Sequence, residues 1–232
     1  MDNSYLAGFI DGDGSICIGK CKGGFQLKLE ITQCNRMMLT MLNKQFTDIG
    51  KLYCDNRDEK YTKESAIQLR FCGKNASKLL DIARTYAIVK APQALLAIEY
   101  LTKINKPGMY DIREDFYNRM KSMNKDKNSY EKDYSKINDA YIAGLLDAEG
   151  NIYYNKTDKV RYYVKITQKC DPTLINHIRT YLGYGQISAS ELYRIRFSSR
   201  QTVKDLWDRI KGHVIIKKEA YVELLNKLDI PL

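Results

Sequence analysis

The sequence contains no long run of apolar residues. None of its apolar stretches approaches the roughly 20 residues that a helix needs to cross a lipid bilayer. The opening residues, Met1 to Ser4, carry neither the basic segment nor the apolar segment of a secretory signal peptide. We therefore expect an intracellular protein with no membrane partner, whose six cysteines stay reduced.

Histidine is scarce, and familiar nucleotide-binding motifs are missing. His177 and His213 are isolated, and Cys17 with Cys21 has no second pair of ligands nearby, so a zinc site is not expected. The sequence has no Walker loop, no dinucleotide fingerprint and no Ser-His-Asp arrangement. These absences give no support to zinc chemistry, to nucleotide-driven chemistry or to serine hydrolase chemistry.

Positive charge is in excess. The chain has 38 Lys and Arg against 28 Asp and Glu, a formal net charge of +10, and its isoelectric point is near 9.2. Such a balance favours a polyanionic partner. Charge alone does not separate DNA from RNA or from an anionic membrane surface.

One stretch of the sequence occurs twice. Residues 5–16 read YLAGFIDGDGSI, and residues 141–152 read YIAGLLDAEGNI. Each copy is an apolar helical segment that runs into two acids one residue apart and then a glycine, which indicates one structural unit used twice. Gly8 and Gly12 share a helix face, and Gly144 and Ala148 stand at the same offsets. We therefore predict that the two helices pack against each other along these small residues.

The residues after each copy predict the same order of elements. In the first half, strands are expected at 15–18, 25–32, 51–53 and 66–71, with helices at 36–46 and at 76–101, the latter interrupted near Pro92. In the second half, strands are expected at 151–155, 161–167, 185–190 and 192–197, with helices at 172–182, 201–211 and 217–228. The prediction is an α+β chain with units at residues 1–104 and 139–232. The charged linker between them, 105–138, is predicted to carry a helix at 111–123.

The second acid of each copy points to metal chemistry. Helices packed along their small faces would bring Asp13 and Glu149 together at their C-terminal ends. A carboxylate there is disfavoured by the helix dipole and by the neighbouring carboxylate, and a divalent cation relieves both effects. Magnesium suits oxygen ligands of this kind, and a pair of such ions can hydrolyse a phosphodiester. The alternative, in which both acids only end their helices, fits less well because the acids recur at equivalent positions.

Two further residue types recur after each copy. Gln33 and Gln168 each close the second strand of their unit on its inward phase. Each could orient a water or a metal, or could equally be a buried, hydrogen-bonded glutamine. Lys90 and Lys217 each open the last helix of their unit, where a lysine could stabilise developing charge on a phosphate. Lys218 could take the place of Lys217, and a surface lysine is the alternative for each.

The doubled stretch resembles the LAGLIDADG motif of homing endonucleases, in the form that carries two motifs in one chain. The resemblance implies a pseudo-twofold pair of αββαββα units, with antiparallel four-stranded sheets that form a DNA-binding saddle and motif helices at the inter-domain interface. It implies that Asp13 and Glu149 bind metal and that the backbone carbonyls of Gly12 and Ala148 add ligands. The glutamines and lysines above match the peripheral active-site positions of the family.

The resemblance also places DNA contacts on outward-facing strand positions. In the first unit these are Ser15, Gln26, Lys28, Glu30, Gln68 and Arg70, and in the second Asn151, Tyr153, Asn155, Lys165, Arg194 and Arg196. Any one of them could instead be part of a solvated strand face. Because the two sets differ at nearly every position, we expect a non-palindromic target.

The expected function is site-specific cleavage of both strands of a long DNA target by a monomer that needs no protein partner, promoting intron homing. Mg²⁺ or Mn²⁺ is the expected cofactor, and Ca²⁺ is expected to bind without supporting cleavage. One alternative is a maturase that binds intron RNA and assists splicing, and another is a DNA-binding protein of the same fold that does not cut. The Lys-, Asn- and Tyr-rich composition suggests a chloroplast or mitochondrion.

Overall fold

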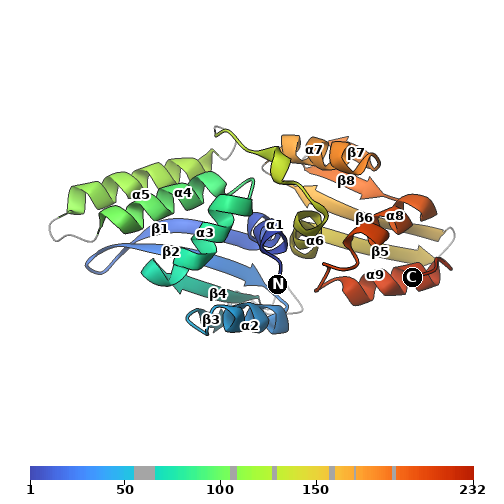
Figure 1. Ribbon diagram of the computed structural model, residues 1–232, viewed down its shortest axis with the longest axis horizontal. Helices are drawn as coiled ribbons and strands as arrows, with labels where there is room; N and C mark the ends of the chain where they lie inside the picture. Colours follow the sequence, from blue (N-terminus) through green and yellow to red (C-terminus); the bar gives the residue numbers. More distant parts are fainter. Residues whose placement is uncertain (55–65, 105–108, 127–129, 157–159, 170, 190–191) are drawn as a thin grey trace. The chain divides into compact units, whose positions relative to one another are not determined.

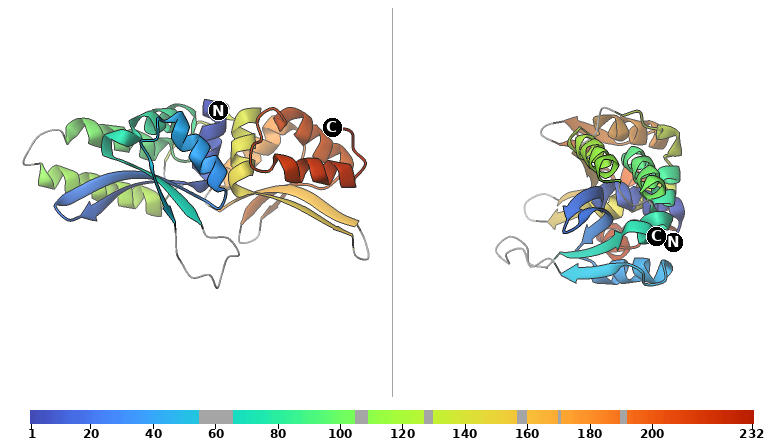
Figure 2. Two further views of the ribbon diagram at one scale, coloured as in Figure 1. Left: turned by 90° about the horizontal axis from the view of Figure 1, so that it is seen from below. Right: turned by 90° about the vertical axis from the view of Figure 1, so that its left-hand side faces the viewer.

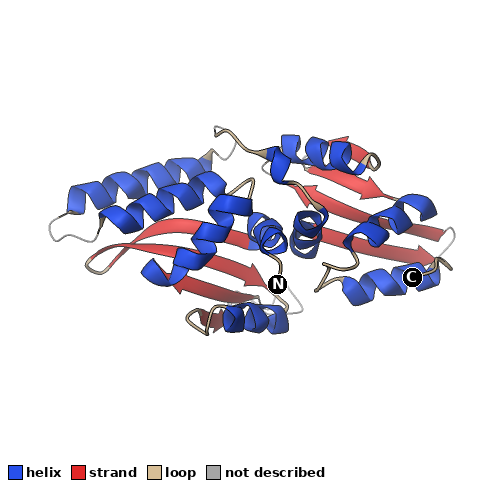
Figure 3. Ribbon diagram, viewed as in Figure 1, coloured by secondary structure: helices blue, strands red, loops and turns tan. Residues whose placement is uncertain are grey.

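The computed structural model describes residues 1–54, 66–104, 109–126, 130–156, 160–169, 171–189 and 192–232. The chain folds into two compact units, and in both of them pairs of strands are followed by helices (Figures 1 and 3). The first unit comprises Asp13–Lys132 with Met1, and the second comprises Asp2–Gly12 with Asp133–Leu232. No helix within the described residues is both long enough and apolar enough to cross a membrane.

The first unit is built on a four-stranded antiparallel sheet with the strand order β1-β2-β4-β3. Its strands are β1 (Gly14–Cys21), β2 (Gly24–Gln33), β3 (Lys51–Cys54) and β4 (Ile67–Cys72). Its α-helices are α2 (Arg36–Gln45), α3 (Ser77–Tyr86), α4 (Ala91–Lys103) and α5 (Tyr110–Lys125), and a short 3-10 helix, η1 (Gly73–Ala76), precedes α3. The helices lie on one face of the sheet, and no described helix covers the other face (Figure 2).

The second unit repeats this topology with the strand order β5-β6-β8-β7. Its strands are β5 (Gly150–Lys156), β6 (Val160–Gln168), β7 (Gln186–Ala189) and β8 (Tyr193–Phe197). Its helices are α6 (Asp139–Glu149), α7 (Pro172–Leu182), α8 (Arg200–Ile210) and α9 (Lys218–Lys227), with the 3-10 helix η2 (Tyr134–Lys136) ahead of α6. The first helix of the chain, α1 (Asn3–Asp13), also belongs to this unit, as far as residue Gly12.

The alternating strand patterns of the sequence explain which face of each sheet is buried. Along β2, Leu27, Leu29 and Ile31 are fully or almost fully buried, whereas the residues between them face away from the core. Val164 and Ile166 show the same phase on β6. The predicted α+β fold, with its two antiparallel four-stranded sheets, is confirmed.

The compact units divide the chain differently from the sequence repeat. The repeat placed boundaries at residues 104 and 138, whereas the contacts of the backbone place α1 with the second unit and α5 with the first. The helix predicted at 111–123 is confirmed as α5, which packs on β1 and β2 through Tyr117, whose ring centroid lies 5.4 Å from that of Phe25. This part of the charged stretch is therefore a folded element of the first unit.

The helices α1 and α6 pack along their small residues, as predicted. A methyl group added at Gly8 would overlap the carbonyl oxygen of Tyr141, and one added at Gly144 would overlap that of Tyr5. A methyl group at Gly12 would likewise overlap the side chain of Ala148. These reciprocal approaches need residues without a bulky side chain because backbone meets backbone.

Candidate active site and outward sheet faces

Asp13 and Glu149 stand at equivalent junctions between a helix and a strand. Asp13 is the last residue of α1 and Glu149 the last of α6, and the next residue begins β1 or β5. Asp13 is half-buried and Glu149 is exposed. Each carboxylate therefore lies at the negative end of a helix dipole, where a bound cation would be favourable.

Gln33 reaches the carboxylate of Asp13. Its Nε2 donates a hydrogen bond of 2.7 Å to Asp13 Oδ2, and its Oε1 accepts one of 2.8 Å from the backbone N–H of Cys34. Because both ends of the amide are used, the direction of the Asp13 carboxylate is fixed. Gln168 takes the equivalent place at the end of β6 and is buried, with 5% of its surface exposed.

The two predicted lysines precede the last helices of their units. Lys90 is the N-cap of α4 and Lys217 the N-cap of α9. Lys90 is buried, whereas Lys217 is half-buried and its Nζ donates to the backbone carbonyl of Asp147. Lys218, the other candidate, is exposed on the first turn of α9. Of these two lysines, only Lys217 is directed at the backbone of α6.

The carboxylate of Asp147 ties α6 to the segment before α9. It accepts backbone hydrogen bonds from Ile215 at 2.7 Å, Ile216 at 3.0 Å and Lys217 at 2.9 Å. It also accepts a hydrogen bond of 2.7 Å from the Tyr5 hydroxyl, and Asp147 is completely buried. A buried carboxylate with several donors is well compensated, so this residue fixes the backbone that presents Lys217.

Asp11, the first acid of the first motif, is bound by a tyrosine of the second motif in the same way. The Tyr141 hydroxyl donates a hydrogen bond of 2.7 Å to Asp11 Oδ2, and both residues are buried. Burial, and next the Asp11 carboxylate, raise the pKa of Tyr141 well above its usual range. The phenol therefore stays neutral and remains a hydrogen-bond donor.

The first unit's candidate DNA contacts lie on the sheet face opposite its helices. They alternate with core positions along β1, β2 and β4: Ser15, Gln26, Lys28, Glu30, Gln68 and Arg70. The strand register places Ser15, Glu30 and Arg70 side by side across the sheet. Because Glu30 and Arg70 form an ion pair, part of the positive charge of this face is neutralised.

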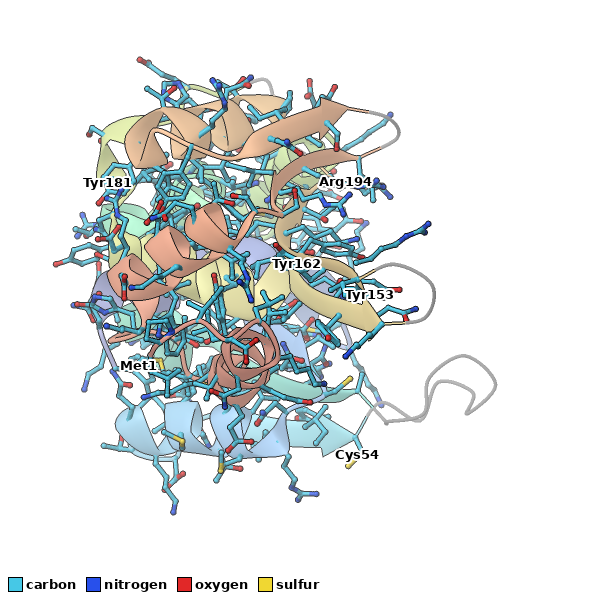
Figure 4. All side chains as sticks on the ribbon, turned by 90° about the vertical axis from the view of Figure 1, so that its right-hand side faces the viewer. Met1, Cys54, Tyr153, Tyr162, Tyr181 and Arg194 are labelled. Atoms are coloured by element: carbon cyan, nitrogen blue, oxygen red, sulfur yellow. The ribbon has the colours of Figure 1, made fainter. Side chains whose placement is uncertain are left out.

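The second unit's candidate contacts also lie on the face away from the helices: Asn151, Tyr153, Asn155, Lys165, Arg194 and Arg196. Figure 4 shows Tyr153 and Arg194 on this side and Tyr181 of α7 on the other. Asn155 Nδ2 donates a hydrogen bond of 3.1 Å to the Tyr153 hydroxyl. Among the described outward positions of β5 to β8 no side chain is acidic. This face is therefore more positive than that of the first unit.

The oxygen atoms at the motif ends fit a hard divalent cation. No group of three or more His, Cys, Asp or Glu side chains suited to a metal occurs in the described part of the chain. Magnesium needs fewer, because it keeps several waters and takes phosphate oxygens as ligands. Within the second unit, a side chain at Gly12 would lie 3.0 Å from Glu149 Cγ, so the Gly12 backbone runs beside this carboxylate. Suitable oxygen donors stand at each motif end: the Asp13 carboxylate in the first unit, and the Glu149 carboxylate with the carbonyls of Gly12 and Ala148 in the second.

Known structures share this architecture along almost the whole chain. The LAGLIDADG meganuclease I-AabMI, solved bound to uncleaved DNA, is 17% identical with a TM-score of 0.78, and the match covers 99% of this chain and 92% of that one. The chain has the LAGLIDADG homing endonuclease fold. I-GzeII, in complex with its DNA target, matches with 14% identity and a TM-score of 0.77 over 99% of this chain and 91% of that one.

A further structure with the LAGLIDADG fold is I-SmaMI bound to cleaved DNA. It is 14% identical, with a TM-score of 0.76, and the match covers 97% of this chain and 88% of that one. I-SmaMI is also known bound to an uncleaved target in the presence of calcium ions. Comparisons with protein-family models and with curated protein sequences gave no match.

Two features of this chain were not predicted from the sequence. The anchoring role of Asp11 and Asp147 could have been suspected, because both acids recur with Tyr5 and Tyr141 in the doubled motif. Tyr163 was also missed as an outward residue. Its ring stacks on Tyr153 at a centroid distance of 5.0 Å. The guanidinium of Arg196 lies over the same ring at 4.4 Å.

Proposed function

We propose that this protein is a monomeric, site-specific DNA endonuclease that depends on a divalent metal ion. The observation that carries the proposal is the pair of equivalent helix-end carboxylates, Asp13 and Glu149, in a chain with a LAGLIDADG fold. The similar proteins I-AabMI, I-GzeII and I-SmaMI are known in complex with DNA, which supports double-stranded DNA as the substrate. Both motifs stand in one chain, which supports a monomer, and the likeness to homing endonucleases suggests a role in intron homing.

The residues at the motif ends and around them would have the following roles in cleavage. Asp13 and Glu149 would hold the metal, with Gln33 orienting the Asp13 carboxylate through its hydrogen bond of 2.7 Å. When bound, a divalent cation polarises a phosphodiester and lowers the pKa of a bound water. Lys90 and Lys217 would place positive charge where negative charge develops, and the Asp147 anchor would hold the Lys217 backbone in position.

The outward sheet faces would bind the DNA. Arg, Lys, Gln and Asn side chains on strands can pair with base edges in the major groove, and other cations can contact phosphates. The two faces differ at equivalent positions, as at Glu30 and Lys165, which supports a non-palindromic target. Mg²⁺ or Mn²⁺ is the proposed cofactor, with Ca²⁺ expected to bind without supporting cleavage. The known complex of I-SmaMI with an uncleaved target in the presence of calcium is consistent with that expectation.

A randomised duplex library tests the proposal. The protein is incubated with the library and Mg²⁺, and the cut ends are sequenced; we expect one long, non-palindromic sequence cut on both strands. Parallel reactions contain Ca²⁺, Mn²⁺ or EDTA, and the matched variants are Asp13→Asn and Glu149→Gln. These variants should bind the selected duplex but cleave it at least about 100-fold more slowly. A rate loss of this size is typical when one electrostatic contact to the transition state is removed.

Two outcomes would overturn the assignment. Tight duplex selection without any cleavage in Mg²⁺ or Mn²⁺ would favour a DNA-binding protein that does not cut. Binding of structured RNA with no duplex selection would favour the maturase alternative. Full activity of Asp13→Asn would refute the role of that carboxylate even if the wild-type enzyme cuts DNA.

A further inference from the structure

The two sheet faces carry an arginine at the same place but with different neighbours. Ser15 pairs with Glu30, which pairs with Arg70, in the first unit. Asn151 pairs with Lys165, which pairs with Arg196, in the second unit. Arg70 and Arg196 are therefore equivalent. Their partner on the second strand of the sheet changes from the acid Glu30 to the base Lys165, whereas on the other side Arg70 pairs with Lys51 and Arg196 with Gln186.

Arg70 is held in one position from several sides. Its Nε atom forms an ion pair with Glu30, and its Nη2 donates a hydrogen bond of 2.7 Å to Gln68 Oε1. Gln68 Nε2 in turn donates to Glu30 Oε2 at 3.4 Å. The guanidinium lies over the Tyr53 ring, 4.5 Å from its centroid. The side chains of Arg70 and Glu30 are 26% and 15% exposed, so this network is partly shielded from solvent.

These contacts leave donors available on the Nη atoms. A guanidinium has five N–H groups in a rigid planar fork. The hydrogen bond to Gln68 uses one on Nη2, and Nε lies against Glu30 in the ion pair without a hydrogen bond to any described residue. The remaining N–H groups, on Nη1 and Nη2, form the edge that can bind the O6 and N7 atoms of guanine together. Glu30 also offsets the charge of Arg70, which weakens its attraction to phosphate without removing the fork.

Among the residues that the structure describes, none supports Arg196 in this way. Its guanidinium lies over the Tyr163 ring at 4.4 Å, and Lys165 Nζ lies over the same ring at 5.3 Å. Its cross-strand neighbours on the two sides are Lys165 and Gln186, so no carboxylate faces it within the sheet. An arginine among like charges is suited to the phosphate backbone, which attracts cations irrespective of sequence.

We propose that Arg70 is a specificity-determining residue that reads one guanine of the target, with Glu30 as the positioning residue that orients it. The proposal rests on the proposed DNA-binding function and adds which base is read and by which side chain. It also assigns different roles to the two arginines, because Arg196 would add affinity for DNA rather than sequence preference. Bidentate recognition of guanine discriminates against other bases by about 5- to 150-fold.

The test is selection by binding, which does not require cleavage. Wild type, Arg70→Lys, Glu30→Gln and Arg196→Lys are each used to select duplexes from a randomised library in Ca²⁺, and affinities for single-base variants of the selected site are measured. Lysine keeps the charge but lacks the fork. Arg70→Lys should therefore reduce the preference for guanine at one position by about 5-fold or more. At a site with another base in that position, Arg70→Lys and wild type should have equal affinities. Arg196→Lys should leave every base preference unchanged.

Glu30→Gln separates orientation from charge. It should bind random duplex more tightly, because a negative charge is removed, while its preference for the same guanine falls. The result that would overturn the inference is a guanine preference that survives Arg70→Lys, or a loss of affinity spread evenly over all sites. A preference unaffected by Glu30→Gln would overturn the positioning role. If wild type selects a duplex but never cuts it in Mg²⁺, only the endonuclease proposal fails; if it selects no duplex, both fail.

Discussion

The hydroxyl of Tyr5 donates a hydrogen bond of 2.7 Å to the carboxylate of Asp147, a residue 142 positions further along the chain. Both side chains are buried, and Tyr5 belongs to the first motif whereas Asp147 belongs to the second. The bond joins α1 to α6 and completes the set of donors around the carboxylate that also holds the segment before α9. The motif residues thus have a structural task as well as the proposed catalytic one.

Removing this hydroxyl should weaken the second unit. Tyr5→Phe takes one donor from a buried carboxylate, and we expect the free energy of unfolding to fall by about 1–3 kcal/mol. Urea unfolding followed by circular dichroism measures the change as a lower midpoint. Tyr86→Phe, which removes an exposed phenol, is the matched control and should leave the midpoint unchanged. Equal midpoints for Tyr5→Phe and wild type would show that the buried bond contributes nothing net.

Substitutions at the helix crossing should cost more than substitutions on an open strand. Gly8→Ala and Gly144→Ala place a methyl group against a backbone carbonyl that cannot rotate away, so we expect a loss of about 1–3 kcal/mol or more. Gly19→Ala is the control, because a methyl group there meets nothing within 4 Å. Thermal unfolding midpoints of the three variants make the comparison. A Gly19→Ala variant as unstable as the other two would contradict the explanation.

The neighbouring lysines before and in α9 should differ in their effect on catalysis. Lys217→Met should lower the single-turnover cleavage rate by about 100-fold or more while duplex affinity changes little, because the positive charge that we propose acts on the reacting phosphate is lost. Lys218→Met should have a much smaller effect, since this side chain is exposed and Lys217 is the one that contacts Asp147. Rapid-quench kinetics on the selected target gives both rates. A larger effect from Lys218→Met would assign the role to that residue instead.

Alkaline pH should destabilise the protein in part through Tyr134. Burial, and next the carboxylate of Asp171, raise the pKa of Tyr134 to about 12. In the unfolded chain the phenol loses its proton near pH 10. Between these values the folded state binds more protons than the unfolded state, so stability falls as pH rises; below about pH 10 this contribution is fully present.

Tyr134→Phe isolates that contribution. The variant should lose less stability than wild type between pH 10 and pH 12, whatever its stability at neutral pH. Urea midpoints at several pH values give the two slopes. Parallel slopes would mean that the phenol titrates alike in both states.

Much of the fold could be predicted from the sequence because it depends on local periodicity. Leu27 and Leu29 alternate with Gln26 and Lys28, and that phase alone identifies the buried face of β2. Small residues at a spacing of four predicted which faces of α1 and α6 meet. The break before α4 could also be anticipated, since Pro92 favours the first turn of a new helix.

Other features could not be predicted, because they depend on what the folded chain brings together. The sequence does not say that the Asp147 carboxylate is capped by the backbone of Ile215 and Ile216, nearly seventy residues away. It also gives Arg70 and Arg196 the same strand phase. Only the cross-strand register shows that their partner on the second strand of the sheet is an acid in one unit and a base in the other. Pairing partners across strands are tertiary facts with no local signature.

The membership of α1 in the second unit has a consequence for the order in which the chain folds. As the protein is synthesised, Tyr5 and Gly8 leave the ribosome long before Tyr141, Gly144 and Asp147. The first unit can form its sheet from Asp13 onward. The second unit can form only after its own strands have been synthesised, and it must then bind α1, which was synthesised first. Contacts of such high sequence separation slow folding, so we expect α1 to be the last element to dock.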